Sequence, residues 1–304
     1  MRPTTRAMQT PAGSGGFQPT MKIAYFGTGL LGAGFVRHQL ELGTTVHVWN
    51  RSPEKARALV ADGAVFFDHP ADAVAGVERI HLTLADDTSV DAVLKPLNGA
   101  IDASTTIVDH TTTAPTPTAD RVKHWAARGK RFVHAPVFMA PTNARDGSGI
   151  MMTSCSQADH DKLKPVLDTM TGKLVYLGDD PLRAASFKLF GNMFIITMMA
   201  GLADVNRLAG SVGISAEDAF SLFSWFNPAP MIPSRAAKIA SQDFTASFEM
   251  TMARKDVRLM IEEAKRHGVG LGVLPAVAAV YDSAIAKGYG ALDASAIAKL
   301  DGRS

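Results

Sequence analysis

The sequence predicts an α/β fold in which an N-terminal, doubly wound, mostly parallel sheet precedes a C-terminal all-helical domain. Short apolar runs alternate with helical patterns up to about residue 180, and only helical patterns follow. A glycine-rich turn joins the first apolar run to the first helical pattern. The 304 residues are enough for two domains with their own cores, and we place these domains at residues 21–180 and 181–304.

The first twenty residues predict a disordered leader, which is either native or introduced during cloning. They are rich in Thr, Pro, Gly and Ser and contain no apolar run, so the apolar segment of a secretory signal is missing. Arg2 and Arg6 give only a weak similarity to a transit peptide. The folded pattern begins at Met21.

The N-terminal half contains a regular series of expected strands and helices. Helical patterns run through Phe35, Val36 and Leu40 and over residues 53–60, 90–94 and 115–127, with Ser52 as the N-cap of the second. Strands are expected at residues 22–26, 46–49, 64–67, 80–84 and 106–109, with further candidates at 131–135, 150–153 and 174–177.

The C-terminal half opens with an unusual helix at residues 187–208. Its only charge before Asp204 is Lys188, and apolar residues surround the helix axis between them. Such a helix is expected to be buried on nearly every side, and its apolar run is shorter than the roughly 18 to 20 residues of a membrane span. Further helices are expected at residues 216–225, 250–267 and 275–287.

Composition narrows the class of protein. Apolar residues make up 46% and charged residues 20%, and the net charge of +2 indicates neither a nucleic-acid partner nor a membrane surface. The one cysteine, Cys155, permits no internal disulfide and fits a reducing, cytoplasmic location. No two histidines have a metal-ligand spacing, so we predict no metal site.

The motif Gly27-Thr28-Gly29-Leu30-Leu31-Gly32 lies between the first strand and the first helix. The first glycine permits a tight turn, the second lets backbone approach a pyrophosphate, and the third permits close packing of helix on strand. The helix N-terminus adds N–H donors and a positive dipole. The motif therefore predicts a dinucleotide-binding Rossmann domain, with an ordinary glycine-containing turn as the alternative.

The end of the second strand indicates which dinucleotide binds. An NAD site usually has Asp or Glu there for the ribose hydroxyls, whereas this chain has Asn50-Arg51-Ser52. Asn50 does not repel a 2′-phosphate, Arg51 can pair with one, and Ser52 can donate to it. These residues favour NADP over NAD, unless Arg51 is a solvated surface charge.

Two later strand ends also point to this ligand, because ligands bind beyond the carboxyl ends of strands in open α/β sheets. Leu84 and Ala85 follow the fourth strand, and the run Asp109-His110-Thr111-Thr112-Thr113 follows the fifth. The threonines offer hydroxyls to a ligand or cap the next helix. His110 beside Asp109 suggests a catalytic pair, but an ordinary polar loop side chain is the simpler interpretation.

Lys188 and Asn192 are the candidate chemical centre, because they lie one helical turn apart on the same face. Placing a lysine at the start of a buried helix is costly unless the cation has a use, and burial lowers its pKa toward the working range. The alternative is a lysine that extends its charged end to the surface.

Four motifs in order resemble the β-hydroxyacid dehydrogenases, which include 3-hydroxyisobutyrate dehydrogenase and the tartronate semialdehyde (glyoxylate/succinic semialdehyde) reductases. The resemblance covers about residues 21–300. The motifs are the glycine turn, Asp109-His110-Thr111-Thr112, Lys188-x-x-x-Asn192, and Lys255-Asp256.

The resemblance implies roles for individual residues. Lys188 would be the general acid in carbonyl reduction and the base in the reverse direction, and Asn192 would hold the substrate. Thr112 would lie by the nicotinamide, in contact with both cofactor and substrate, and Lys255 near the cofactor.

The substrate loop departs from the family pattern Ala-Pro-Val-Ser-Gly-Gly. Here it ends in Phe138-Met139-Ala140, so the serine hydroxyl and both glycines are replaced. We expect these three residues to contact the substrate.

The predicted function is hydride transfer between NADP(H) and a small-molecule β-hydroxyacid or semialdehyde. One alternative is an NADPH-dependent reductase of imines or bulky apolar carbonyls, and another is a non-catalytic nucleotide-binding scaffold. The apolar helix at residues 187–208 suggests a homodimer or homotetramer.

Overall fold

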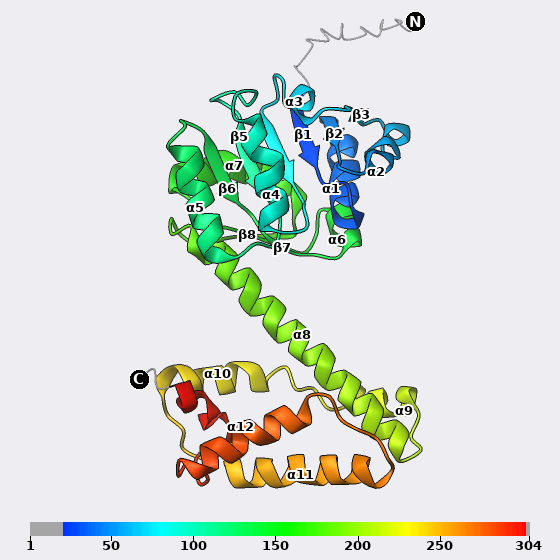
Figure 1. Cartoon of the computed structure of the whole chain (residues 1–304), viewed down its shortest axis with the longest axis vertical. Coiled ribbons are helices and arrows are strands. Elements are labelled where there is room, and N and C mark those ends of the chain that lie inside the picture. The colour runs from blue at the N-terminus through cyan, green and yellow to red at the C-terminus, as the bar shows by residue number, and fades with distance from the viewer. Residues whose placement is uncertain (1–20, 302–304) are drawn as a thin grey trace, which may run out of the picture. The chain divides into compact units, whose positions relative to one another are not determined.

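The computed structural model describes residues 21–301 of the chain (Figure 1). They form two compact units that divide between Gly191 and Asn192. The predicted leader at residues 1–20 lies outside the described residues.

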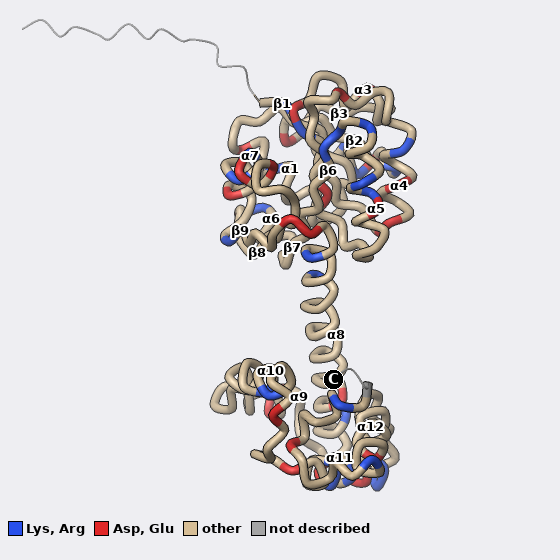
Figure 2. The backbone as a smooth tube through the Cα atoms, turned by 90° about the vertical axis from the view of Figure 1, so that its left-hand side faces the viewer, with Lys and Arg blue, Asp and Glu red and all other residues tan. Residues whose placement is uncertain are grey.

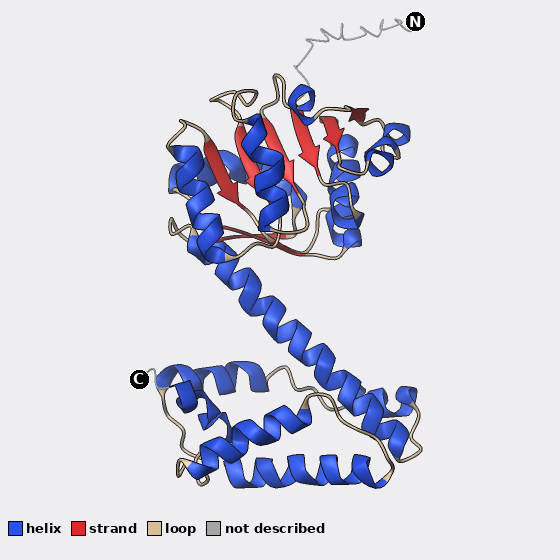
Figure 3. Ribbon diagram, in the orientation of Figure 1, coloured by secondary structure: helices blue, strands red, loops and turns tan. Residues whose placement is uncertain are grey.

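The first unit is built on a six-stranded, entirely parallel sheet (Figure 3). The strand order is β3-β2-β1-β4-β5-β6, so the chain reverses its direction of winding between β1 and β4. A ligand crevice is expected at this switch point. The strands are β1 (Lys22–Phe26), β2 (Thr45–Trp49), β3 (Val65–Phe66), β4 (Arg79–Leu82), β5 (Thr106–Asp109) and β6 (Arg131–His134).

Helices cover both faces of this sheet because alternate strand residues are apolar on opposite sides. Ile23 and Tyr25 of β1 belong to one buried cluster, while Ala24 and Phe26 belong to another. α1, α6 and α7 contribute to the first cluster, and α3, α4 and α5 to the second. The helices are α1 (Leu30–Glu41), α2 (Pro53–Arg57), α3 (Pro70–Ala73), α4 (Asp87–Leu94), α5 (Pro115–Ala126), α6 (Pro141–Asp146) and α7 (Gln157–Leu167).

The doubly wound α/β fold with a helical second part is confirmed, but several elements differ from prediction. The expected strands at 150–153 and 174–177 do not extend the main sheet. They form a separate sheet as β8 (Ile150–Thr153) and β9 (Lys173–Tyr176), with β7 (Val137–Phe138) antiparallel to β8.

The fourth strand ends two residues earlier than expected, at Leu82. Thr83, Leu84 and Ala85 leave the sheet and line a cavity instead. Ser52 precedes α2 but its side chain makes no capping hydrogen bond.

The second unit is helical, as predicted. One helix, α10, was not predicted, and α9 ends at Ser221, where a 3₁₀ turn follows. The helices are α8 (Leu182–Ser211), which begins in the first unit, α9 (Ala216–Ser221), α10 (Met231–Ser241), α11 (Met250–Arg266), α12 (Leu274–Ala286) and the 3₁₀ segment η5 (Ala294–Asp301).

Two expectations about the apolar helix were wrong. α8 has 30 residues, and its most apolar 18-residue window has a mean hydropathy of 1.4, so by length and composition it could cross a membrane. Only 11% of that window is buried, although we expected burial on nearly every side. Figure 2 shows the long stretch of α8 that carries neither acidic nor basic residues. A helix that is apolar on all sides is expected to be covered by other parts of a protein. The pattern does not say whether the same chain or another chain covers it.

Two buried carboxylates organise the helical unit, whose own buried apolar cluster is small. Asp204 of α8 accepts hydrogen bonds from the backbone N–H groups of Gly272, Val273 and Leu274, at 2.6, 2.7 and 3.2 Å. These donors open α12, so the carboxylate caps this helix and complements its positive end.

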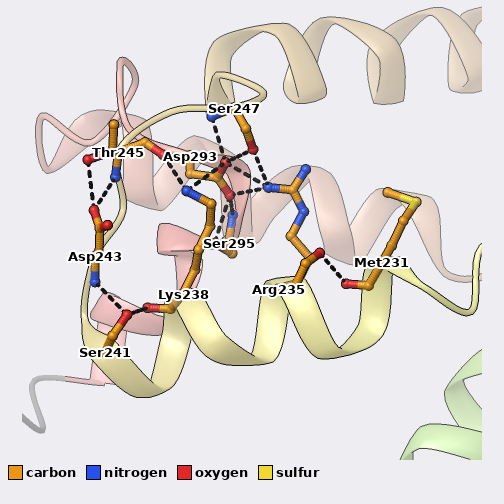
Figure 4. Close-up of polar contacts among 10 residues, drawn as sticks. Met231, Arg235, Lys238, Ser241, Asp243, Thr245, Ser247, Asp293 and Ser295 are labelled. Atoms are coloured by element: carbon orange, nitrogen blue, oxygen red, sulfur yellow. Dashed lines mark hydrogen bonds and ion pairs between the residues drawn. The ribbon is translucent and has the colours of Figure 1, made fainter.

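Asp293 is the second buried carboxylate, and its side chain is fully buried. Figure 4 shows the polar contacts around it. It accepts from the Arg235 guanidinium at 2.7 Å and from the backbone and hydroxyl groups of Ser247 and Ser295. Although burial opposes ionisation, these donors hold the pKa of Asp293 well below its ordinary value. The carboxylate thereby joins α10, the loop before α11 and η5.

We predict that Asp293→Ala destabilises the protein by about 3 to 5 kcal/mol, because it leaves the Arg235 cation and several donors without their acceptor. Urea denaturation followed by circular dichroism measures the change. Asp282→Ala is the matched control, since Asp282 is exposed and water screens its ion pair with Arg254. Equal losses in the two variants would contradict this role for Asp293.

Candidate functional site

A cavity of about 530 Å³ opens at the switch point of the parallel sheet. It brings together predicted cofactor residues from the ends of three strands: Gly27, Gly29, Asn50, Arg51, Ser52, Leu84 and Ala85. Its lining does not include Thr28, Leu30, Leu31, Gly32 or Thr112. Sequence reasoning missed the other lining residues, which are Trp49, Lys55, Pro70, Thr83, Ser89, Ala92, Val93 and Pro96.

Each of the three glycines in the turn has a different steric reason for lacking a side chain. Gly27 has φ +89°, and a Cβ there would lie 2.0 Å from the carbonyl oxygen of Thr83. A Cβ on Gly32 would lie 1.9 Å from the carbonyl oxygen of Gly27. Gly29 differs, because a Cβ there would meet nothing within 4 Å and the residue lines the cavity. Backbone open to a cavity at the start of α1 fits a pyrophosphate.

The remaining residues of the turn support this arrangement. Thr28 is buried, and its backbone N–H donates to Asn50 Oδ1 at 3.1 Å. The Asn50 amide group also donates to the backbone carbonyl of Ser52 at 3.0 Å, so this side chain joins the glycine turn to the end of β2. Leu30 is 83% exposed at the first position of α1, and Leu31 packs partly against the core.

Positive charge gathers on the β2 side of the cavity. Arg51 and Lys55 both line it, four residues apart, and both are exposed. Lys55 could have been found from its place in the first turn of a helix that follows the nucleotide-selecting strand. The opposite, apolar wall comes from α3, α4 and the turn after α4, and no sequence motif marks it.

The three threonines after β5 have different roles: two have buried, hydrogen-bonded side chains, and the third is exposed. The Thr111 hydroxyl accepts from the backbone N–H of Leu84 at 3.0 Å and so ties together the loops after β4 and β5. Thr113 shares hydrogen bonds with Thr118 and His134, at 2.8 and 3.1 Å. Thr112 is exposed between these two buried residues and is the threonine that can contact a ligand.

His110 is not an ordinary polar loop side chain, because it is buried in the core. Its Nδ1 donates to the carbonyl oxygen of Ala135 at 2.8 Å, so its Nε2 accepts from His81 Nδ1 at 3.0 Å. Burial lowers the pKa of His110 to about 4 and raises that of Asp109 to about 6. A neutral, fully engaged histidine is a structural part of the sheet rather than a proton carrier.

Lys188 lies in the second turn of α8 and is partly buried. Its Nζ lies 4.3 Å from the centre of the Phe138 ring, and burial lowers the pKa of the ammonium group. Asn192 follows one turn later on the same helix and is also partly buried. The structure therefore provides a desolvated cation whose partner in the first unit is an aromatic ring.

The other residues of the substrate loop have different surroundings. Met139 packs against the core cluster that includes Phe35 and Met151. Ala140 is exposed, and its backbone N–H donates to Asn143 Oδ1 at 2.8 Å.

Lys255 belongs to the second unit, where it pairs with Asp256 at 2.8 Å. Its proximity to the cofactor stays a prediction. Within residues 21–301 no group of three or more metal-ligating side chains comes together.

Two family descriptions match consecutive parts of this chain. Residues 22–178 match the NAD binding domain of 6-phosphogluconate dehydrogenase. Residues 183–300 match the NAD-binding domain of NADP-dependent 3-hydroxyisobutyrate dehydrogenase. The chain belongs to the β-hydroxyacid dehydrogenase family. It is therefore an oxidoreductase with an NAD(P)-binding Rossmann domain, as its motifs predicted.

Individual relatives and solved structures align along nearly the whole chain. An uncharacterized oxidoreductase, YfjR of Bacillus subtilis, is 27% identical, and the alignment covers 92% of this chain and 99% of the relative. The 2-(hydroxymethyl)glutarate dehydrogenase of Eubacterium barkeri is also 27% identical, with 93% and 95% covered. The imine reductase of Streptomyces aurantiacus shares the fold, with a TM-score of 0.85 at 23% identity over 92% and 99% of the two chains.

We predict that Gly29→Ala leaves the fold intact but weakens dinucleotide binding at least about tenfold, because its methyl group would enter space meant for the ligand. Gly32→Ala, in which the new methyl group meets backbone, should instead lower the melting temperature. Thermal denaturation and fluorescence titration with NADPH separate the two effects. Unchanged affinity in Gly29→Ala would contradict the assignment of this cavity to the dinucleotide.

Proposed function

We propose that this protein transfers a hydride between NADP(H) and a β-hydroxyacid or semialdehyde, with Lys188 as general acid in reduction and general base in oxidation. The observation that carries the proposal is the partly buried Lys188, whose pKa is lowered by desolvation, in the motif Lys188-x-x-x-Asn192 that resembles the family's catalytic motif.

The chemistry requires such a cation. The nicotinamide, when bound, supplies or accepts the hydride. As a carbonyl is reduced, its oxygen develops negative charge, which a nearby ammonium group stabilises and then neutralises by donating a proton. Asn192, one turn away on α8, is proposed to orient the substrate, and the exposed Thr112 hydroxyl to contact cofactor and substrate.

We predict that Lys188→Ala lowers kcat for reduction about 10² to 10⁴-fold, because the proton donor is lost. NADPH affinity should stay within about twofold of the wild type, since Lys188 does not line the dinucleotide cavity. Steady-state kinetics and a direct cofactor titration measure the two quantities. A loss of turnover smaller than tenfold would refute the role of Lys188.

The proposed preference for NADP is supported by the charges around the cavity. Arg51 and Lys55 contribute two cations and Ser52 a hydroxyl, and none of the lining residues is acidic. A 2′-phosphate has the charge and the acceptor oxygens that these groups would bind.

We predict that Arg51→Ala combined with Lys55→Ala weakens NADPH binding about tenfold to a hundredfold and leaves NADH binding nearly unchanged. Isothermal titration with each nucleotide measures this. Lys95→Ala combined with Lys123→Ala, which removes two exposed lysines outside the lining, is the control for net charge. Equal affinity of the wild type for NADPH and NADH would contradict the proposal.

One observation favours the second candidate, a reductase of imines or bulky apolar carbonyls. An aromatic ring lies against Lys188 where the family has a serine, and the Ala140 N–H that could hold a carboxylate already donates to Asn143. A screen of carboxylate-bearing aldehydes against uncharged carbonyls and cyclic imines decides between the two. A clear preference for the uncharged set would overturn the β-hydroxyacid proposal.

We further propose a cytoplasmic homodimer or homotetramer with no membrane or nucleic-acid partner. The exposed apolar side chains of α8 support self-association. A monomer in sedimentation at micromolar concentration would contradict this proposal.

A further inference from the structure

We propose that Phe138 is a positioning residue that holds the Lys188 ammonium group on the face of its ring, and that Gly191 lacks a side chain so that this ring fits. The inference rests on the proposed catalytic role of Lys188. All three residues belong to the first unit.

The contact has the geometry of a cation–π interaction. Lys188 Nζ lies 4.3 Å from the Phe138 ring centre, well inside the limit of about 6 Å for such pairs. The backbone beneath the ring is ordered, because Phe138 belongs to β7 and pairs with Ile150 of β8. A rigid ring therefore offers a fixed platform to a long, flexible side chain.

Gly191 explains how the ring approaches α8 so closely. A Cβ on Gly191 would lie 2.3 Å from Cζ and 2.7 Å from Cε1 of Phe138, closer than any real contact allows. The ring edge therefore rests directly on the helix backbone, three residues after Lys188. Gly201 of the same helix shows the contrast, because a Cβ there would meet nothing within 4 Å.

A ring suits a proton donor better than a carboxylate does. An ion pair would fix Lys188 but would also stabilise its proton strongly. Among the described residues the lysine ion pairs within 4.0 Å belong to Lys95, Lys164, Lys238 and Lys255, and Lys188 has none. Burial is the cause of its lowered pKa. β7, which contacts it, has no titratable side chain, and the nearby Arg183 stacks on Phe187. The quadrupole of the ring favours the ammonium form only modestly, so the proton stays transferable.

The sign of the effect follows from this arrangement. The ring favours the protonated form and so opposes the lowering caused by burial. Replacing Phe138 by Leu keeps an apolar side chain but removes the ring face, so the pKa of Lys188 falls further. Because reduction requires the ammonium form, the alkaline limb of kcat/KM then moves to lower pH.

The test compares the pH profiles of the wild type, Phe138→Leu and Phe138→Tyr. We expect the alkaline limb to shift downward by about 0.5 to 1 pH unit in Phe138→Leu and to return in Phe138→Tyr, which restores an aromatic face. A purely structural role for Phe138 would lower the rate at every pH and leave the limb in place, and that result would overturn the inference.

Gly191→Ala supplies an independent variant, because its methyl group must displace the ring. It should shift the limb in the same direction as Phe138→Leu, and it should add no further shift when combined with Phe138→Leu. Gly201→Ala is the matched control on the same helix and should shift nothing. Independent, additive shifts from Gly191→Ala and Phe138→Leu would contradict the coupling.

A direct titration separates this inference from the proposed function. The pH dependence of competitive acetylation at Lys188, read by mass spectrometry, reports its pKa without any turnover. If Lys188→Ala keeps its activity, the proposed function fails while the labelling curve still tests Phe138. If the labelling curves of the wild type and Phe138→Leu coincide, the inference about Phe138 fails.

Discussion

The first unit depends on one steric constraint, the passage of the chain from β1 into α1 through Gly27 and Gly32. At both positions the space for a Cβ is taken by a backbone carbonyl group. This close contact draws the start of α1 against the ends of β1 and β4. This close contact positions the cavity at the switch point. It also positions the two groups that line the cavity, the exposed backbone of Gly29 and the cations after β2.

Much of this site could be predicted because local sequence determines it. The spacing of the three glycines, the strand before them and the residues Asn50 to Ser52 are close in the chain, and each has a direct physical reason. The apolar wall of the cavity could not be predicted in this way. Pro70, Val93 and Pro96 come from separate segments, and only the packing of α3 and α4 on the sheet brings them to one surface.

The type of a residue predicted its surroundings less well where contacts between distant parts of the chain determine them. His110 follows a strand and has a polar side chain, yet His81 and Ala135 satisfy it inside the core. From the sequence Phe138 indicated only the loss of a serine, because nothing local places it against α8. The apolar character of α8 was evident from composition, but composition does not reveal its 30-residue length or its exposure.

The buried carboxylates of the helical unit affect how this unit can fold. Asp204 fixes α8 to the start of α12, and Asp293 fixes α10 to η5, without any contribution from the exposed apolar side chains of α8. The unit can therefore reach its internal arrangement while that surface is still in contact with water. The proposed association of two chains would then be a separate, concentration-dependent step between preformed partners, and not the event that folds them.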